Sequence, residues 1–194
     1  MVRRLHANIA SGFIFALFVH IGRGLYYGSY MAWKVWMVGV VMFVVVMGVA
    51  FLGYVLPWGQ MSFWGATVIT NMITVVPYAG QDLSWWLWGG YTVGDPTLKR
   101  FFVFHFLLPF VVAFLSVVHL VHLHEGGSRN PLGVKEDFMG VRFHSYYTFK
   151  DVVGLLVFFG ILLFIVFLFP HIFRDPVNFL PANPIKTPEH IKPE

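Results

Sequence analysis

The chain of 194 residues contains no cysteine and few charged residues, which make up 11% of the sequence. Without cysteine, disulfides, thiolate metal sites and thioether-linked cofactors are all excluded. Apolar residues make up 58% of the chain and its mean hydropathy is +0.72. This composition indicates a membrane protein and excludes an ordinary soluble domain. The net charge of +4 needs no anionic partner, because basic residues commonly flank membrane spans.

Four apolar runs are long enough to cross a bilayer, which takes about 20 residues. They cover residues 5–21, 35–56, 101–123 and 152–170. Only helices satisfy their backbone groups inside lipid, so we expect an all-α membrane protein with four transmembrane helices. The fourth run is almost purely aliphatic and aromatic, which is typical of a lipid-facing scaffold helix.

The long connection at residues 57–100 is apolar and rich in tryptophan, which favours the membrane–water interface. Within it, residues 62–75 are too short to span and predict a surface-lying or re-entrant helix. The proline-rich tail at residues 176–194 is expected to be extended along the surface and not helical. We expect two parts: residues 1–127, a three-helix bundle with the interfacial loop, and residues 128–194, a polar loop, the fourth helix and the tail.

Two of the apolar runs carry paired histidines at one spacing. His6 and His20 are fourteen residues apart, and so are His105 and His119. Fourteen residues advance a helix by ~21 Å and return to within roughly 40° of the starting direction. Each pair therefore points one way, near the two faces of a hydrocarbon core of about 30 Å.

The order of the spans then predicts which histidines meet. The second span reverses the chain, so the first and third run parallel, and His6 faces His105 while His20 faces His119. Neutral imidazoles from two sides can clamp one iron each, which predicts two stacked bis-histidine haems. The alternatives are core histidines bonded to neighbouring helices, or a bare metal, although zinc normally takes three or four protein ligands.

Two glycines of the second span and two arginines beside the first span lie near the levels of these histidines. Gly39 and Gly53, also fourteen apart, would let a flat macrocycle edge approach the second span, or serve ordinary helix packing. Arg3 and Arg23 each lie three residues outside a histidine, where they could pair with haem propionates or snorkel at a helix end.

Several contiguous motifs resemble cytochrome b of the respiratory bc complex, Complex III. They are RRLHAN at 3–8, HIGRGLYYGSY at 20–30, GYVLPWGQMSFWGATVITN at 53–71, FHFLLPF at 104–110, HEGGSRNP at 124–131, YYTFKD at 146–151 and PANPIKTPEHIKPE at 181–194. The resemblance covers essentially the whole chain. It implies that His6 and His105 bind the low-potential haem, and that His20 and His119 bind the high-potential haem. The plastid relative has one more residue between the second pair and a cysteine for an additional haem, and this chain has neither.

The resemblance also implies a quinol-oxidation pocket beside the low-potential haem. Its residues map to Phe51, Tyr54, Met61, Gly65, Ile69, Pro193 and Glu194. Glu194 would accept a quinol proton, although taken alone a terminal glutamate is more often a solvated end.

A quinone-reduction pocket is implied near the high-potential haem. His124 and Asp151 would donate hydrogen bonds and protons to the quinone, with Ser128 and Lys150 nearby. The third span ends and the fourth begins on one side of the membrane, so His124 and Asp151 can converge. Taken alone, they also fit ordinary interfacial polarity.

The expected function is therefore that of a dihaem subunit of quinol–cytochrome c reductase, with ubiquinone as substrate and proton translocation as the result. The expected partners are an iron–sulfur (Rieske) protein, a cytochrome c1-type subunit and a second copy of the complex, in the mitochondrial inner membrane or, alternatively, a bacterial plasma membrane. The family's first helix and its helices after the Pro-Glu motif are missing, so we expect further cytochrome b segments to supply them. Basic residues number six on one side and seven on the other, so they do not orient the chain. The opposing hypothesis is a haem-free structural or assembly subunit.

Overall fold

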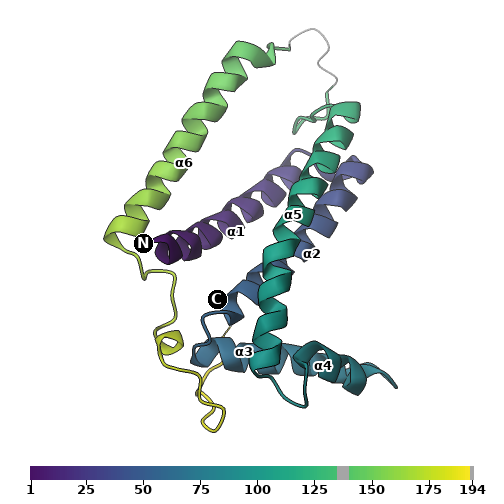
Figure 1. Cartoon of the computed structure of the whole chain (residues 1–194). Coiled ribbons are helices and arrows are strands. Elements are labelled where there is room, and N and C mark those ends of the chain that lie inside the picture. Colours follow the sequence, from purple (N-terminus) through teal and green to yellow (C-terminus); the bar gives the residue numbers. More distant parts are fainter. Residues whose placement is uncertain (135–139, 193–194) are drawn as a thin grey trace. The chain divides into compact units, whose positions relative to one another are not determined.

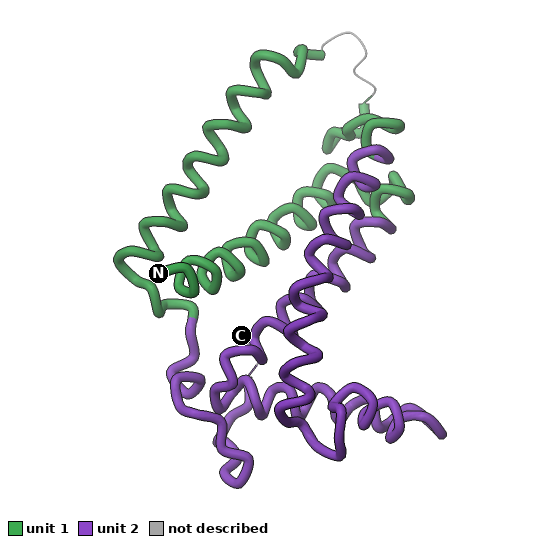
Figure 2. The backbone as a smooth tube through the Cα atoms, viewed as in Figure 1, with its two compact units in different colours: residues 1–36, 123–173 green, residues 37–122, 174–194 purple. Residues whose placement is uncertain are grey.

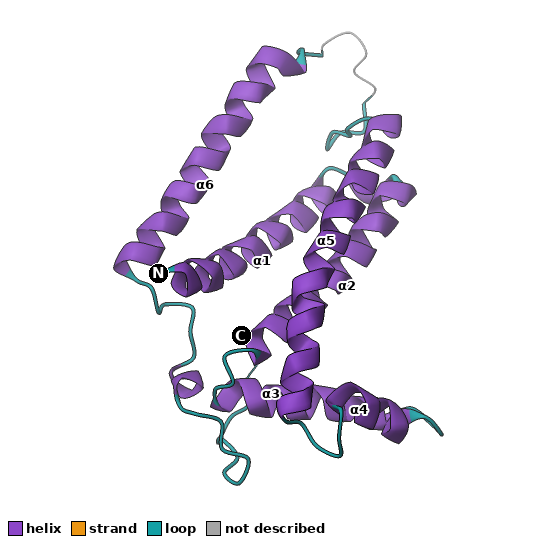
Figure 3. Cartoon of the chain, viewed as in Figure 1, coloured by secondary structure: helices purple, strands orange, loops and turns teal. Residues whose placement is uncertain are grey.

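The structure is a computed structural model that describes residues 1–134 and 140–192. Within those residues it is helical, with no strand (Figure 3). The α-helices are α1 Val2–Tyr26, α2 Trp33–Val55, α3 Gln60–Asn71, α4 Gly80–Trp88, α5 Asp95–Gly126 and α6 Thr148–Leu168 (Figure 1). The short helical turns are η1 Ser29–Met31, η2 Met72–Val75, η3 Phe143–Tyr147 and η4 Pro176–Phe179. The all-α prediction is confirmed.

The four predicted spans are confirmed, and each helix is longer than its apolar run. Helices long and apolar enough to cross a membrane cover Val2–Tyr26, Trp33–Val55, Asp95–Gly126 and Phe143–Leu168. The third starts six residues before the predicted residue 101, because Asp95 in its first turn complements the positive end of the helix dipole. Polar end residues thus extend helices beyond the hydrocarbon-facing run.

The chain forms two compact units (Figure 2). Unit 1 combines Met1–Trp36 with Leu123–Phe173, and unit 2 combines Met37–His122 with Arg174–Glu194. Each unit takes segments from both sides of residue 127. The predicted division into residues 1–127 and 128–194 stays a prediction.

In unit 1, α1 packs against α6. The buried Asn8 amide donates from Nδ2 to the Arg4 carbonyl at 2.8 Å and to the Pro170 carbonyl at 3.1 Å. One turn further along α1, Gly12 lies directly against the side chain of Leu162 on α6. Small residues let membrane helices approach closely, and the Asn8 bond fixes the start of α1 at the end of α6.

In unit 2, the core is where α2 ends, α3 passes and α5 begins. Its buried apolar side chains are Val55, Ala66, Trp88, Val93 and Phe101. A buried hydrogen-bond chain ties these elements together. Trp88 donates from Nε1 to Thr70 Oγ1 at 2.7 Å, and Thr97 Oγ1 donates to the Trp88 carbonyl at 2.8 Å.

The long connection and the tail depart from the sequence expectation in detail. The predicted helix at residues 62–75 is α3, which begins two residues earlier, followed by the 3-10 turn η2. The prediction that the tail contains no helix is wrong for its first four residues, which form the 3-10 turn η4. Asp175 caps this turn by accepting from the Val177 N–H at 2.8 Å. Pro176 fits there because the first helical position needs no N–H donor.

Candidate functional site

Two histidines of α5, His105 and His119, lie against α2, each beside a glycine. A Cβ added at Gly39 would lie 3.2 Å from His119 Cε1, and one added at Gly53 would overlap the His105 ring. Both histidines are half-buried. Because α2 and α5 are antiparallel, equal spacings of fourteen on the two helices bring a glycine to each histidine. The glycines therefore lie at the histidine levels, as the spacing predicts, and the room that they leave holds the imidazole rings.

His105 is oriented by the backbone of α2. Its Nδ1 lies 2.9 Å from the Val49 carbonyl oxygen. In an α-helix the carbonyl of residue 49 lies beside residue 53, so the missing side chain at Gly53 also exposes this acceptor. Donation from Nδ1 makes Nε2 the nitrogen that the ring offers to a metal. Histidines that bind metals generally make such a bond with their other nitrogen, so His105 fits the role of a haem ligand.

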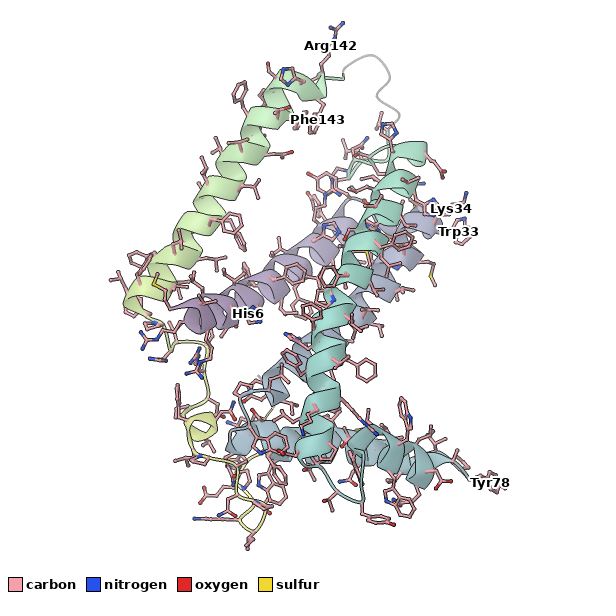
Figure 4. The ribbon with its side chains drawn as sticks, in the orientation of Figure 1. His6, Trp33, Lys34, Tyr78, Arg142 and Phe143 are labelled. Carbon is pink, nitrogen blue, oxygen red and sulfur yellow. The ribbon has the colours of Figure 1, made fainter. Side chains whose placement is uncertain are left out.

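The other two predicted ligands lie on α1, in unit 1. His6 and His20 are on one unbroken helix, and both are exposed on this chain (Figure 4 labels His6). Arg3 and Arg23 are exposed as well, and the Arg23 guanidinium lies 4.8 Å from the centre of the Tyr27 ring. His6 and His20 belong to unit 1 whereas His105 and His119 belong to unit 2, so the pairing across α1 and α5 stays a prediction.

In residues 1–134 and 140–192, no group of three or more histidine, aspartate or glutamate side chains gathers in a way that could hold a metal ion. A haem iron held from two sides takes only one histidine from each helix. The donor set that α5 presents therefore suits a haem better than a bare zinc ion, which takes three or four protein ligands.

Five of the predicted quinol-pocket residues lie on α2 and α3. Met61, Gly65 and Ile69 share one face of α3 at a spacing of four, and a Cβ added at Gly65 would meet nothing within 4 Å. On α2, the Tyr54 carbonyl accepts from the Ser62 hydroxyl of α3 at 2.6 Å. The Phe51 ring packs edge-on against Phe101 of α5, with the ring centres 5.8 Å apart. Pro193 and Glu194 lie outside the described residues.

A cavity of about 640 Å³ occurs elsewhere in unit 2 and was not anticipated. Trp58, Trp64 and Trp88 line it, together with Ala182 and Pro184 of the tail. None of the five described quinol-pocket residues lines it. The tryptophan-rich composition of residues 57–100 was the available signal, but it was interpreted as interfacial anchoring.

The four predicted quinone-reduction residues all lie in unit 1 and are exposed. His124 is in the last turn of α5, and Lys150 and Asp151 are in the first turn of α6. The Lys150 ammonium lies 5.2 Å from the centre of the Tyr146 ring. In the described part of the chain no hydrogen bond or ion pair joins His124 to Asp151, so their convergence stays a prediction.

The residues that sequence reasoning missed are Gln60 and Asn178. Gln60 is buried at the start of α3, and its side chain bonds the backbone of residues 183 and 186 in the tail. Asn178 accepts from the Ser62 N–H at 2.9 Å. The available signal was a polar residue within the aromatic stretch at residues 57–64.

Comparison with known proteins places these features in one family. Residues 1–127 match the family model described as cytochrome b/b6/petB. Among solved structures, the fold is similar to a chain of a hyperthermophilic respiratory Complex III, with a TM-score of 0.86 and 35% sequence identity. The match covers 99% of this chain and 53% of that chain. The chain thus spans about half the length of that relative.

Proposed function

The chain belongs to the cytochrome b family, and from that premise we propose that it carries electrons across a membrane within a quinol–cytochrome c reductase. In this proposal, quinol is oxidised near one membrane face, a quinone such as ubiquinone is reduced near the other, and proton translocation results. The chain acts as part of a complex, with further cytochrome b segments completing the subunit.

The observation that carries the proposal is that α1 and α5 each carry two histidines at one spacing, with Gly53 of α2 beside His105 and Gly39 beside His119. His6 and His105 would hold the low-potential haem, and His20 and His119 the high-potential haem. Haem bound there supplies reversible one-electron transfer at two depths in the membrane.

The chain's own residues hold and tune these sites. The Val49 carbonyl orients His105 and, by accepting from Nδ1, makes the ring a more basic ligand. His105 and His119 lie half-buried beside the apolar helix α2. Arg3 and Arg23 stand three residues outside the α1 histidines, where a guanidinium can pair with a carboxylate of the porphyrin.

Proton handling falls to residues near the two membrane faces. At quinol oxidation, the α3 face of Met61, Gly65 and Ile69 binds the quinol with Phe51 and Tyr54, and the Glu194 carboxylate, next to Pro193, accepts a proton. At quinone reduction, His124 and Asp151 deliver protons, with Ser128 and Lys150 beside them. Each assignment pairs an acid–base side chain with a step that releases or takes up a proton.

The partners follow from the same proposal. They are a Rieske iron–sulfur protein, a cytochrome c1-type subunit and a second copy of the complex, in the mitochondrial inner membrane or a bacterial plasma membrane. Two equal spacings of fourteen and the absence of cysteine favour the respiratory over the plastid type.

The test is a reduced-minus-oxidised spectrum of the assembled complex. We expect two b-type components, of which His105→Ala removes one and His20→Ala removes the other, because each iron loses one of two axial ligands. His122→Ala is the matched control on α5 and should keep both components. A complex without b-type bands would favour the alternative of a structural or assembly subunit.

A further inference from the structure

The cavity of about 640 Å³ in unit 2 has the size of a small-ligand pocket, which is generally about 300–1,000 Å³. Residues of α3, the end of α4, the start of α5 and the tail line it. The described residues of the predicted quinol pocket do not line it. The cavity is therefore a candidate site for a ligand other than the quinol.

Aromatic rings at right angles to one another line one part of this cavity. The centres of the Trp58 and Phe63 rings lie 5.7 Å apart with an interplanar angle of 86°. Phe63 and Trp64 repeat the arrangement, with centres 5.5 Å apart and an angle of 86°. Perpendicular rings can present a ring face from two directions to one group. Aromatic cages bind quaternary ammonium groups in this way, because the negative face of each ring attracts a cation.

Several hydrogen-bond donors of the lining are already bonded within the chain. The Trp64 indole donates from Nε1 to the Asn183 carbonyl at 3.1 Å. The Thr67 hydroxyl donates to the Phe63 carbonyl at 2.9 Å, and Asn71 Nδ2 donates to the Thr67 carbonyl at 2.7 Å. The amide bond of Asn71 leaves its Oδ1 as an acceptor. The lining thus has acceptors for a positively charged group.

The charge of the cavity has the same sign. Among the described residues that line it, Asp95 is the one with a charged side chain, and it is exposed to a ligand. Lys99 and Arg100 follow on α5 but do not line the cavity. The hydroxyl groups of Tyr91 and Thr92 can donate or accept, so they leave this balance unchanged. The lining therefore favours a cation over an anion.

We propose that this cavity binds a quaternary ammonium group, with aromatic rings around its methyl groups and Asp95 as its counter-ion. The source of that group is the choline headgroup of a membrane phospholipid. Trp58 lies three residues after the end of α2, and Asp95 begins α5, so the cavity lies at the ends of two helices that can span the membrane. Phospholipid headgroups and tryptophan side chains share this level of the bilayer.

The first test is binding of choline to the assembled complex after its lipid is exchanged for a nonionic detergent, measured by saturation-transfer NMR. We expect saturable binding of choline. The uncharged isostere, in which a tert-butyl group replaces the trimethylammonium group, should bind at least about fivefold more weakly, because the cation–π attraction is lost. Equal binding of the two compounds, or no binding of choline, would overturn the proposal.

Two variants locate the site, each with a matched control that lies outside the lining. Asp95→Asn should weaken choline binding about threefold, as loss of an exposed counter-ion does, whereas Asp82→Asn in the first turn of α4 should leave it unchanged. Trp64→Leu should weaken it about fivefold or more, and Trp86→Leu should not. Equal affinities of Asp95→Asn and Asp82→Asn would overturn the proposal, also where Trp64→Leu does not assemble.

Competition identifies the source of the ammonium group. Dihexanoyl phosphatidylcholine should displace choline from the complex, whereas dihexanoyl phosphatidylglycerol, which has the same chains and no cation, should not. Failure of the phosphatidylcholine to displace choline would overturn the lipid headgroup as the ligand and leave a soluble cation. Displacement by both lipids would show that the acyl chains and not the headgroup occupy the cavity, which also contradicts the proposal.

Discussion

Gly53 leaves a gap in the side-chain surface of α2 that the His105 imidazole fills. The same gap exposes the Val49 carbonyl, to which Nδ1 of the ring is bonded at 2.9 Å. A single glycine thus gives His105 both its space and its orienting acceptor.

Gly53→Ala is therefore expected to displace His105 and to weaken or remove the low-potential component of the b-type spectrum. The added methyl group overlaps the ring, and backbone on either side of it cannot yield. Gly48→Ala on the same helix is the matched control, because a Cβ there meets nothing within 4 Å. A redox titration of both complexes measures the effect, and equal low-potential amplitudes in the two would contradict it.

Much at this scale could be predicted from sequence, because it depends only on helical periodicity. The spacing of fourteen placed Gly39 and Gly53 at the levels of His119 and His105, and the structure agrees. The bond from His105 to Val49 was not predictable, since it joins a side chain to a backbone group on another helix. The roles of the quinone-site residues stay predictions for the same reason: they depend on contacts beyond one helix.

At the scale of elements, buried hydrogen bonds connect α3, α4 and α5. The hydropathy pattern of the sequence does not predict these bonds. Trp88 at the end of α4 donates to Thr70 on α3, and its carbonyl accepts from Thr97 in the first turn of α5. These groups are almost fully buried. The start of the helix that carries His105 is therefore fixed to α3 and α4.

Trp88→Phe should destabilise the assembled complex by about 2 kcal/mol or more, because it removes the bond to Thr70 and leaves a small cavity in the core of unit 2. The midpoint of thermal loss of the b-type spectrum measures this. Trp86→Phe makes the same change on α4 at a side chain that is 65% exposed, and should cost no more than about 0.5 kcal/mol. Equal midpoints for the two variants would show that the Trp88 bond does not stabilise the start of α5.

The sequence predicted the membrane helices, but not the residues at which they begin and end or the hydrogen bonds that attach them to other elements. Long apolar runs are decisive for a span, whereas polar residues such as Asp95 can either end a helix or begin it. The tail was expected to be extended only because it is rich in proline. The 3-10 turn after Asp175 depends on one local hydrogen bond, and the contact of the tail with Gln60 depends on a bond between residues far apart in sequence. Composition encodes neither.

At the scale of the whole molecule, the proposed haem binding needs one histidine from each unit at every iron. His6 and His20 come from unit 1, and His105 and His119 come from unit 2. Contacts within each unit hold its two histidines at this spacing. In unit 1, α1 is an unbroken helix, and Asn8 bonds its start to the Pro170 carbonyl just after α6. In unit 2, two glycines of α2 lie beside His105 and His119 of α5.

The most direct measurement is a cryo-electron microscopy map of the assembled complex in its membrane mimetic. We predict density for one porphyrin between His6 and His105 and for a second between His20 and His119. A map in which these four side chains turn toward lipid, with no macrocycle between α1 and α5, would contradict it.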